Sequence, residues 1–165
     1  MNRNMIATSA LIALAIVGLM WWGGANDVPA HSQPDVNTNS ALSASERMFD
    51  FGVISMKNGN VDHVFKVANP TDKDDMIERL STSCMCTTAY IIDGASRTGP
   101  FGMPGMGYGS KASKLLRARG TMDIDVVYDP NAHGPAGVGP MERFIQLTDV
   151  NGGVLQLQIK ALVRP

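Results

Sequence analysis

The sequence predicts an all-β domain, an immunoglobulin-like antiparallel sandwich of about seven strands, preceded by one N-terminal transmembrane helix. Two observations predict this fold class. From Glu46 onward, apolar residues recur with a period of two in short runs separated by Gly, Asn and Asp, which is typical of half-buried strands. Ahead of these runs lies an uncharged apolar stretch long enough to cross a bilayer. We therefore divide the chain into an anchor at 1–24, a linker at 25–45 and a sandwich domain at 46–165.

The predicted anchor is the stretch from Met5 to Trp22, in which only Thr8 and Ser9 are polar. At about 1.5 Å per residue it spans roughly 27 Å, close to the thickness of the hydrocarbon core. Because Arg3 precedes it, we expect the N-terminus in the cytoplasm and the C-terminal domain outside, in the periplasm or at the cell surface. A cleaved signal peptide, which would release a secreted domain, stays the alternative because small residues follow at 23–25.

The composition excludes several kinds of partner. The 165 residues carry 14 basic and 15 acidic side chains, a formal charge of −1, so no basic surface for nucleic acid is expected. Seventeen Gly and nine Pro indicate a folded, loop-rich domain. Small polar residues and two prolines predict a flexible linker at 25–45. The remaining partners we expect are the membrane, through the N-terminal helix, and another protein of the cell envelope.

The strands are read from alternation and from the turns that bound them. In the clearest run, Val154 to Val163, every second residue from Leu155 onward is apolar, and Gln and Lys stand between them at 156, 158 and 160. The residues Asn151-Gly152-Gly153 before it predict a tight hairpin, so the last two strands should pair antiparallel. The predicted strands are 48–54, 61–69, 76–81, 87–92, 121–128, 143–150 and 154–163.

Four segments of this domain carry a resemblance. They are Phe49-Asp50-Phe51-Gly52-Val53-Ile54, the strand from Val61 to Asn69, Ser83-Cys84-Met85-Cys86-Thr87, and Val126-Val127-Tyr128-Asp129. In this order they resemble the bacterial domain-of-unknown-function family 1573 (DUF1573), over roughly 49–163. The family is similar to the ASPM/SPD-2/hydin type of immunoglobulin-like module, so the resemblance implies this fold and an exported location, and it implies no activity. The chain departs from the family at Met85, where Gly is more usual, and in its long Gly- and Met-rich segment after Cys86.

Cys84 and Cys86 are the first candidates for chemistry. If this segment is an extended strand, both side chains project from one face. Three interpretations stay open: two buried thiols that act as small apolar side chains, a strained and easily reduced disulfide, or a pair of soft metal ligands. The most plausible metal is Cu(I), because thiolates and thioethers select soft ions.

Two Gly- and Pro-rich loops supply the other candidate ligands. Met103 and Met106 lie in the loop 99–109, and a mobile loop whose methionines fill a surface gap is the alternative. His133 lies in the loop 129–140, and it could approach the cysteines because loops gather at the ends of a sandwich. The candidate metal ligands are therefore Cys84, Cys86, Met103, Met106 and His133.

No motif of a nucleotide site, a serine hydrolase or a zinc protease is present. We therefore expect a non-enzymatic, membrane-anchored binding domain of the envelope, with Cu(I) binding or delivery as the alternative. Thiol-disulfide exchange by Cys84 and Cys86 is the third hypothesis. The sequence around the pair has neither a predicted helix N-terminus nor an adjacent basic residue, either of which would stabilise a thiolate.

Overall fold

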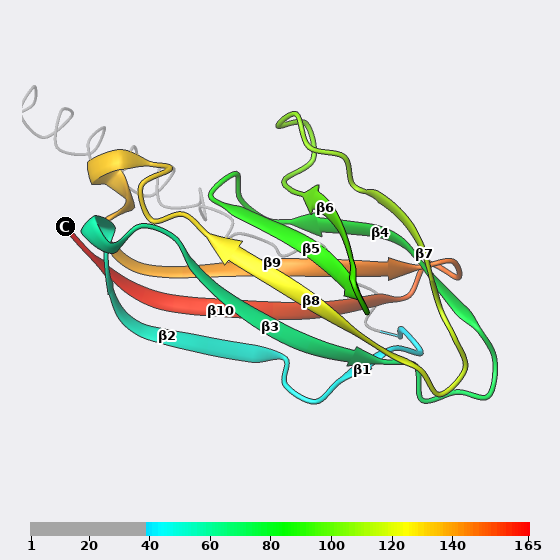
Figure 1. The fold of residues 1–165 in the computed structure, drawn as a ribbon. Helices are drawn as coiled ribbons and strands as arrows, with labels where there is room; N and C mark the ends of the chain where they lie inside the picture. Colours follow the sequence, from blue (N-terminus) through cyan, green and yellow to red (C-terminus); the bar gives the residue numbers. More distant parts are fainter. Residues whose placement is uncertain (1–38) are drawn as a thin grey trace, which may run out of the picture. The chain divides into compact units, whose positions relative to one another are not determined.

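Two five-stranded β-sheets pack against each other in the computed structural model, which describes residues 39–165 (Figure 1). One sheet has the strand order β1-β3-β8-β5-β6, and the other has the order β2-β10-β9-β4-β7. The predicted all-β sandwich is confirmed, whereas the predicted number of strands was wrong. The ten strands are β1 (Ser43–Ala44), β2 (Met48–Ser55), β3 (Val61–Ala68), β4 (Asp75–Thr82), β5 (Thr87–Asp93), β6 (Ser96–Phe101), β7 (Lys111–Leu116), β8 (Thr121–Tyr128), β9 (Gly139–Asp149) and β10 (Val154–Arg164).

The predicted anchor at 1–24 and the linker up to residue 38 lie outside the described residues. Within 39–165, no helix has the length and apolar character that crossing a membrane requires. The last residues of the expected linker belong to the sandwich, because Ser43–Ala44 pairs with β3 as β1 and Leu42 is buried. Two short 3-10 helices, η1 (Met56–Asn58) and η2 (Gly134–Gly137), lie in connections between strands.

The alternation predicted from the sequence forms a single core between the sheets. The two longest regular runs, β8 and β10, bury the residues that were expected to face inward. Burial of this apolar surface is the main favourable contribution to folding. In β10 every second residue from Leu155 to Val163 is buried, and in β8 the same holds from Met122 to Tyr128. The largest side chains with almost no exposed surface are Tyr128, Phe65, Ile77, Leu80, Ile91, Ile124, Ile145, Leu147, Leu155, Leu157 and Ile159.

The pairing of strands confirms the C-terminal hairpin and adds one feature that alternation does not reveal. β9 and β10 pair antiparallel over ten residue pairs, from Val154 opposite Thr148 to Val163 opposite Gly139. The other edge of β10 pairs with β2 in parallel, with a β-bulge between Lys160 and Leu162. β2, from the start of the domain, is therefore the edge strand next to β10, the last strand of the chain (Figure 1).

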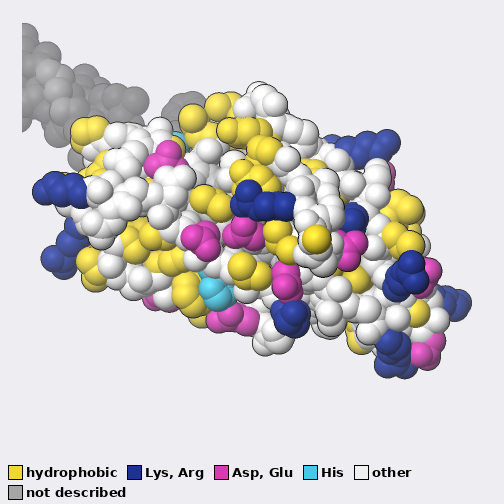
Figure 2. All heavy atoms as spheres, in the orientation of Figure 1, with side chains coloured by type: hydrophobic (Ala, Val, Ile, Leu, Met, Phe, Trp, Pro, Cys, Tyr) yellow, Lys and Arg dark blue, Asp and Glu magenta, His cyan; other side chains and the backbone are white. Residues whose placement is uncertain are grey.

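The solvent-facing surface mixes charges of both signs. Figure 2 shows Lys and Arg side chains interspersed with Asp and Glu over the face turned to the viewer. Asp123 and Asp125, predicted to face outward from β8, form ion pairs with Lys66 at 2.9 Å and Arg97 at 2.7 Å, respectively. The Lys66–Asp123 pair is exposed and contributes little to the free energy of unfolding. The Asp125 side chain is 15% exposed, and its buried Oδ1 has no hydrogen-bond partner among the described residues.

Candidate functional site

The cysteines lie in the turn by which the chain leaves one sheet and enters the other. This turn, residues 83–86, connects β4 to β5. Ser83 fixes it to β9, because its N–H donates to the carbonyl of Phe144 and its Oγ accepts the N–H of Phe144, both at 2.9 Å. The N–H of Thr87 donates to the carbonyl of Cys84 at 3.1 Å and closes the turn. The extended segment considered from the sequence is therefore a tight turn, and its two thiols converge for that reason.

Three of the five predicted ligands come together at this turn. The sulfurs of Cys84 and Cys86 and a ring nitrogen of His133 all lie within 4.8 Å of one another. We call these three residues the thiol-imidazole cluster. Nε2 of His133 is 3.1 Å from Sγ of Cys84, and His133 is the residue just before η2, in the connection from β8 to β9. Both thiols are free in this structure, with Cys84 half-buried and Cys86 buried.

Arg143 completes the surroundings of the cluster and was missed from the sequence. Its Nε donates to Sγ of Cys86 at 3.1 Å, and its Nη1 donates to the carbonyl of Glu142 at 2.8 Å. It lies on β9 in the same alternating series as the buried Met141 and Ile145. A cation in a core-facing register of a strand is unusual unless it is paired, and that feature could have identified it.

Hydrogen bonds and charge make the two thiols unequal. Burial alone raises the pKa of Cys84, but the side chain and N–H of Cys86, the ring of His133 and the charge of Arg143 outweigh it and lower this pKa to about 7. The N–H of Cys86 lies 3.4 Å from Sγ of Cys84. Burial, and the hydrogen bond with the Cys84 side chain, raise the pKa of Cys86 despite the donor from Arg143. Cys84 is therefore the thiol that ionises first.

The predicted methionines lie close to the same end of β4 but outside the cluster. The base of their loop is fixed beside the cysteine turn, because the N–H of Thr82 donates to the carbonyl of Gly102 at 3.3 Å. Met103 is half-buried and Met106 is 46% exposed, and the N–H of Met106 donates to the carbonyl of Met103 at 3.2 Å. The structure thus places both thioethers in one turn, and neither forms a hydrogen bond with the thiol-imidazole cluster.

A hollow of 270 Å³ opens beside the cysteine turn. The methionine loop contributes Tyr108 to its wall, and the turn contributes Met85 and Cys86. The remaining lining residues are Asn60, Thr88, Tyr90, Val127 and Asp129. This arrangement gives a small polar molecule or a partner side chain room next to Cys86.

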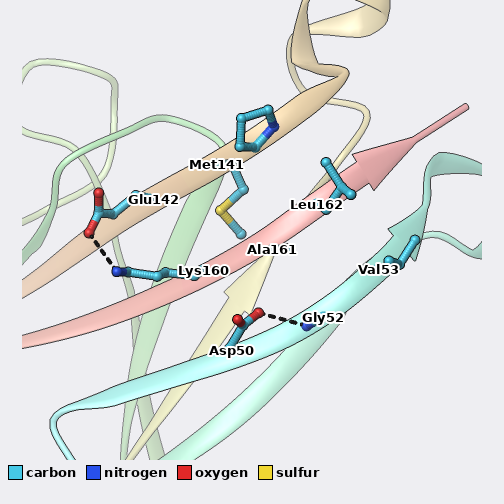
Figure 3. Close-up of a pocket in the computed structure, with 9 residues that line it drawn as sticks. Asp50, Gly52, Val53, Met141, Glu142, Lys160, Ala161 and Leu162 are labelled. Carbon is cyan, nitrogen blue, oxygen red and sulfur yellow. Dashed lines mark hydrogen bonds and ion pairs between the residues drawn. The ribbon is translucent and has the colours of Figure 1, made fainter.

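A larger groove of 490 Å³ lies elsewhere, across β2, β10 and β9 (Figure 3). Its charged groups already have partners: Asp50 accepts the N–H of Gly52 at 2.7 Å, and Lys160 pairs with Glu142 at 3.4 Å. The remaining lining is mostly apolar, with Val53 and Leu162 exposed. The groove contains no thiol, imidazole or unpaired carboxylate, so the chemistry of the described residues is concentrated at the cysteine turn.

Gly52 sets the bulge beside this groove and offers a local test of the backbone. Its φ of +67° is left-handed, and no atom lies within 4 Å of an added Cβ. Replacing Gly52 with Ala is therefore expected to lower the free energy of unfolding by about 1 kcal/mol, through backbone strain alone. Gly52→Asn should cost less, because Asn tolerates this conformation. Urea unfolding measures both, and equal stability of wild type and Gly52→Ala would contradict the assigned conformation.

Comparison with known proteins gives a family and a fold. A family model described as "Protein of unknown function (DUF1573)" matches residues 42–101, which confirms the resemblance seen in the sequence. No curated protein matches the chain. Among solved structures, a protein of unknown function from Porphyromonas gingivalis W83 is similar, with a TM-score of 0.54 and 10% identity, over 73% of this chain and 46% of that one.

Two further structures show weaker similarity. The secreted serine protease VesC from Vibrio cholerae has a TM-score of 0.49 and 12% identity, over 77% of this chain and 24% of that one. The CupB2 chaperone of Pseudomonas aeruginosa has a TM-score of 0.40 and 13% identity, over 73% of this chain and 55% of that one. This chain thus spans about half or less of these proteins, and only the fold of the Porphyromonas protein bears on it.

Proposed function

Residues 42–101 belong to the DUF1573 family, and from this premise we propose that the protein is a non-catalytic, immunoglobulin-like domain that binds one Cu(I) ion. The ligands are the sulfurs of Cys84 and Cys86 and the ring nitrogen of His133. The observation that carries this proposal is the convergence of these three atoms within 4.8 Å of one another, from two connections far apart in the sequence.

The donor set favours Cu(I) over the common alternatives. Thiolates select soft ions, and imidazole binds copper as well as zinc. The trio supplies one protein ligand fewer than the four that a structural zinc ion takes. In the part of the chain that the structure describes, the only group of three or more His, Cys, Asp or Glu donors placed to hold an ion is this trio.

The surroundings also favour the ionised thiols that a metal requires. A ligand thiol must lose its proton, so a cysteine with a pKa of about 7 is ready to bind near neutral pH. The backbone N–H of Cys86 donates to Sγ of Cys84, and Arg143 donates to Sγ of Cys86. Donors of this kind hold metal ligands in position and reduce the cost of their charge.

The proposal retains the expected placement of the domain. We propose that it faces the outside of the cytoplasmic membrane, tethered by the anchor expected at 1–24, and that another envelope protein exchanges the ion with it. Met103 and Met106, in the exposed turn next to the cluster, supply soft thioethers at which an ion can pass in or out.

Anaerobic titration of the reduced full-length protein with Cu(I), against a chromogenic chelator, tests the proposal. One ion per chain is expected, with the affinity lowered at least about 100-fold in Cys84→Ser/Cys86→Ser and about tenfold or more in His133→Ala. His63→Ala is the matched control, because His63 lies on β3 and pairs with Glu46. Wild-type protein that takes up no Cu(I), or a double variant that binds as tightly as wild type, would refute it.

Thiol-disulfide exchange is the second candidate, and the unequal thiols favour it. The sequence suggested that no basic group adjoins the cysteines, but His133 and Arg143 do. In the reaction, the Cys84 thiolate attacks one sulfur of a partner disulfide, which forms a mixed disulfide and releases one partner thiolate; Cys86, after losing its proton, attacks Sγ of Cys84, which forms the Cys84–Cys86 disulfide and releases the second partner thiolate. Equilibration of the same preparations with glutathione buffers separates the two functions, since a pair that stays reduced in oxidised glutathione removes this candidate.

A further inference from the structure

Among residues 39–165, Arg143 is the one permanent positive charge bonded to the thiol-imidazole cluster. Its guanidinium is held at two points, by Nε on the sulfur of Cys86 and by Nη1 on the carbonyl of Glu142. The residue is half-buried on β9, and its neighbours in the inward series, Met141 and Ile145, are apolar and buried. Its charge therefore acts on the cluster at short range and through a medium that screens less than water does.

We propose that Arg143 makes the site selective for a monovalent metal ion over a divalent one. This inference rests on the Cu(I) site proposed above, and it identifies Arg143 as the group that selects the ion. Two thiolates and one guanidinium sum to a single negative charge. A monovalent ion brings this half-buried group to neutrality, whereas a divalent ion leaves an uncompensated positive charge, which is costly away from water. The guanidinium also repels a divalent ion twice as strongly as a monovalent one.

The other groups around the cluster do not cancel this effect. His133 is neutral when its ring nitrogen binds a metal. Tyr128, at the end of β8, is buried and its phenol stays protonated at neutral pH, because burial raises its pKa. The Asp129 carboxylate accepts the N–H of Asn131 at 2.8 Å through Oδ1 and, unlike the Arg143 guanidinium, forms no hydrogen bond with a sulfur of the cluster. The number of ligands also disfavours a structural zinc ion, because such an ion takes four protein donors and the cluster has three.

The test compares the affinities of reduced full-length protein for Cu(I) and for Zn(II), each measured by chelator competition. Arg143→Gln and Arg143→Leu remove the charge, and Arg143→Lys keeps it. The ratio of Cu(I) to Zn(II) affinity should fall at least about tenfold in both neutral variants and stay within about threefold of wild type in Arg143→Lys. If the neutral variants only disturbed the packing, both affinities would fall together and the ratio would not change. Arg143→Lys would then not differ from the neutral variants. Leu suits the core-facing position if Gln prevents folding.

The outcomes separate this inference from the function on which it rests. If wild-type protein binds Cu(I) and the neutral variants keep its affinity ratio, Arg143 is not the selecting group and the inference is overturned. The inference is also overturned if the ratio of Cu(I) to Zn(II) affinity falls as far in Arg143→Lys as in Arg143→Leu, because the positive charge is then not the selecting feature. If wild-type protein binds no Cu(I), the proposed function fails first. Ag(I), a second soft monovalent ion, should follow Cu(I) across all four proteins.

Discussion

Cys84 is expected to react with iodoacetamide far faster than Cys86 near neutral pH, with a rate that rises through a midpoint near pH 7. Its pKa is lowered to about 7 from the ordinary value of 9.0, so about half of it is thiolate at pH 7, against about 1% for an unperturbed thiol. Cys86 is buried and its pKa is raised, so it lacks both ionisation and access. Rate constants from pH 5 to 10, with mass spectrometry assigning the label to each cysteine, measure the difference.

The direction of the pH dependence follows from the sign of the shift. A thiol with a lowered pKa in the folded protein is ionised above pH 7, and it becomes protonated and unreactive as the pH falls through 7. His133→Ala removes the ring hydrogen bond to Cys84 and should move the midpoint upward, toward 9.0. His63→Ala leaves the cluster intact and should not move it. A wild-type midpoint near 9, or equal rates for the two cysteines, would show that the described hydrogen bonds do not form in solution.

The sequence predicts the strands that bury one whole face in the core. A strand with one face buried must alternate, so β8 and β10 were predicted within one residue of their ends. β6 and β7 were missed for the converse reason. Each lies at an edge of its sheet, each buries one residue, and their sequences have no apolar alternation. Such a strand is specified by the neighbour with which it pairs, which is β5 for β6 and β4 for β7.

The candidate site was predictable in its residue types but not in its grouping. Cysteine and methionine are soft ligands and the imidazole of histidine binds copper, so each is a candidate ligand from its residue type alone. Whether they meet depends on the pairing of the sheets: His133 reaches Cys84 across 49 residues of sequence, and Arg143 reaches Cys86 across 57. The crossing turn at 83–86, fixed on β9, produces both contacts. Period-two alternation says which side of a strand a residue faces, but it does not say which strand lies opposite.

Replacing Asp149 with Ala is expected to lower the free energy of unfolding by about 3 kcal/mol, a large part of the stability of a domain of this size. Asp149 is 1% exposed and ends β9 at the hairpin. Its Oδ1 accepts the N–H groups of Asn151 and Gly153 at 2.9 and 2.8 Å, and its Oδ2 accepts the hydroxyl of Ser40 at 2.8 Å. Alanine would leave these donors without partners in a largely buried position, and that cost exceeds the value of the bonds themselves.

Asp149→Asn is the matched control, and it decides what the carboxylate contributes. The amide oxygen can keep both bonds to the turn N–H groups, and the amide nitrogen can donate to the hydroxyl of Ser40, so most of the stability should remain. Ser40→Ala removes the bond that ties the start of the described chain to the hairpin, together with the local bond from the N–H of Leu42 to the Ser40 hydroxyl, and a loss of about 1 to 2 kcal/mol is expected. Urea unfolding followed by circular dichroism orders the three variants. If Asp149→Ala is as stable as wild type, the hairpin does not depend on this carboxylate; if Asp149→Asn is as unstable as Ala, it depends on the negative charge.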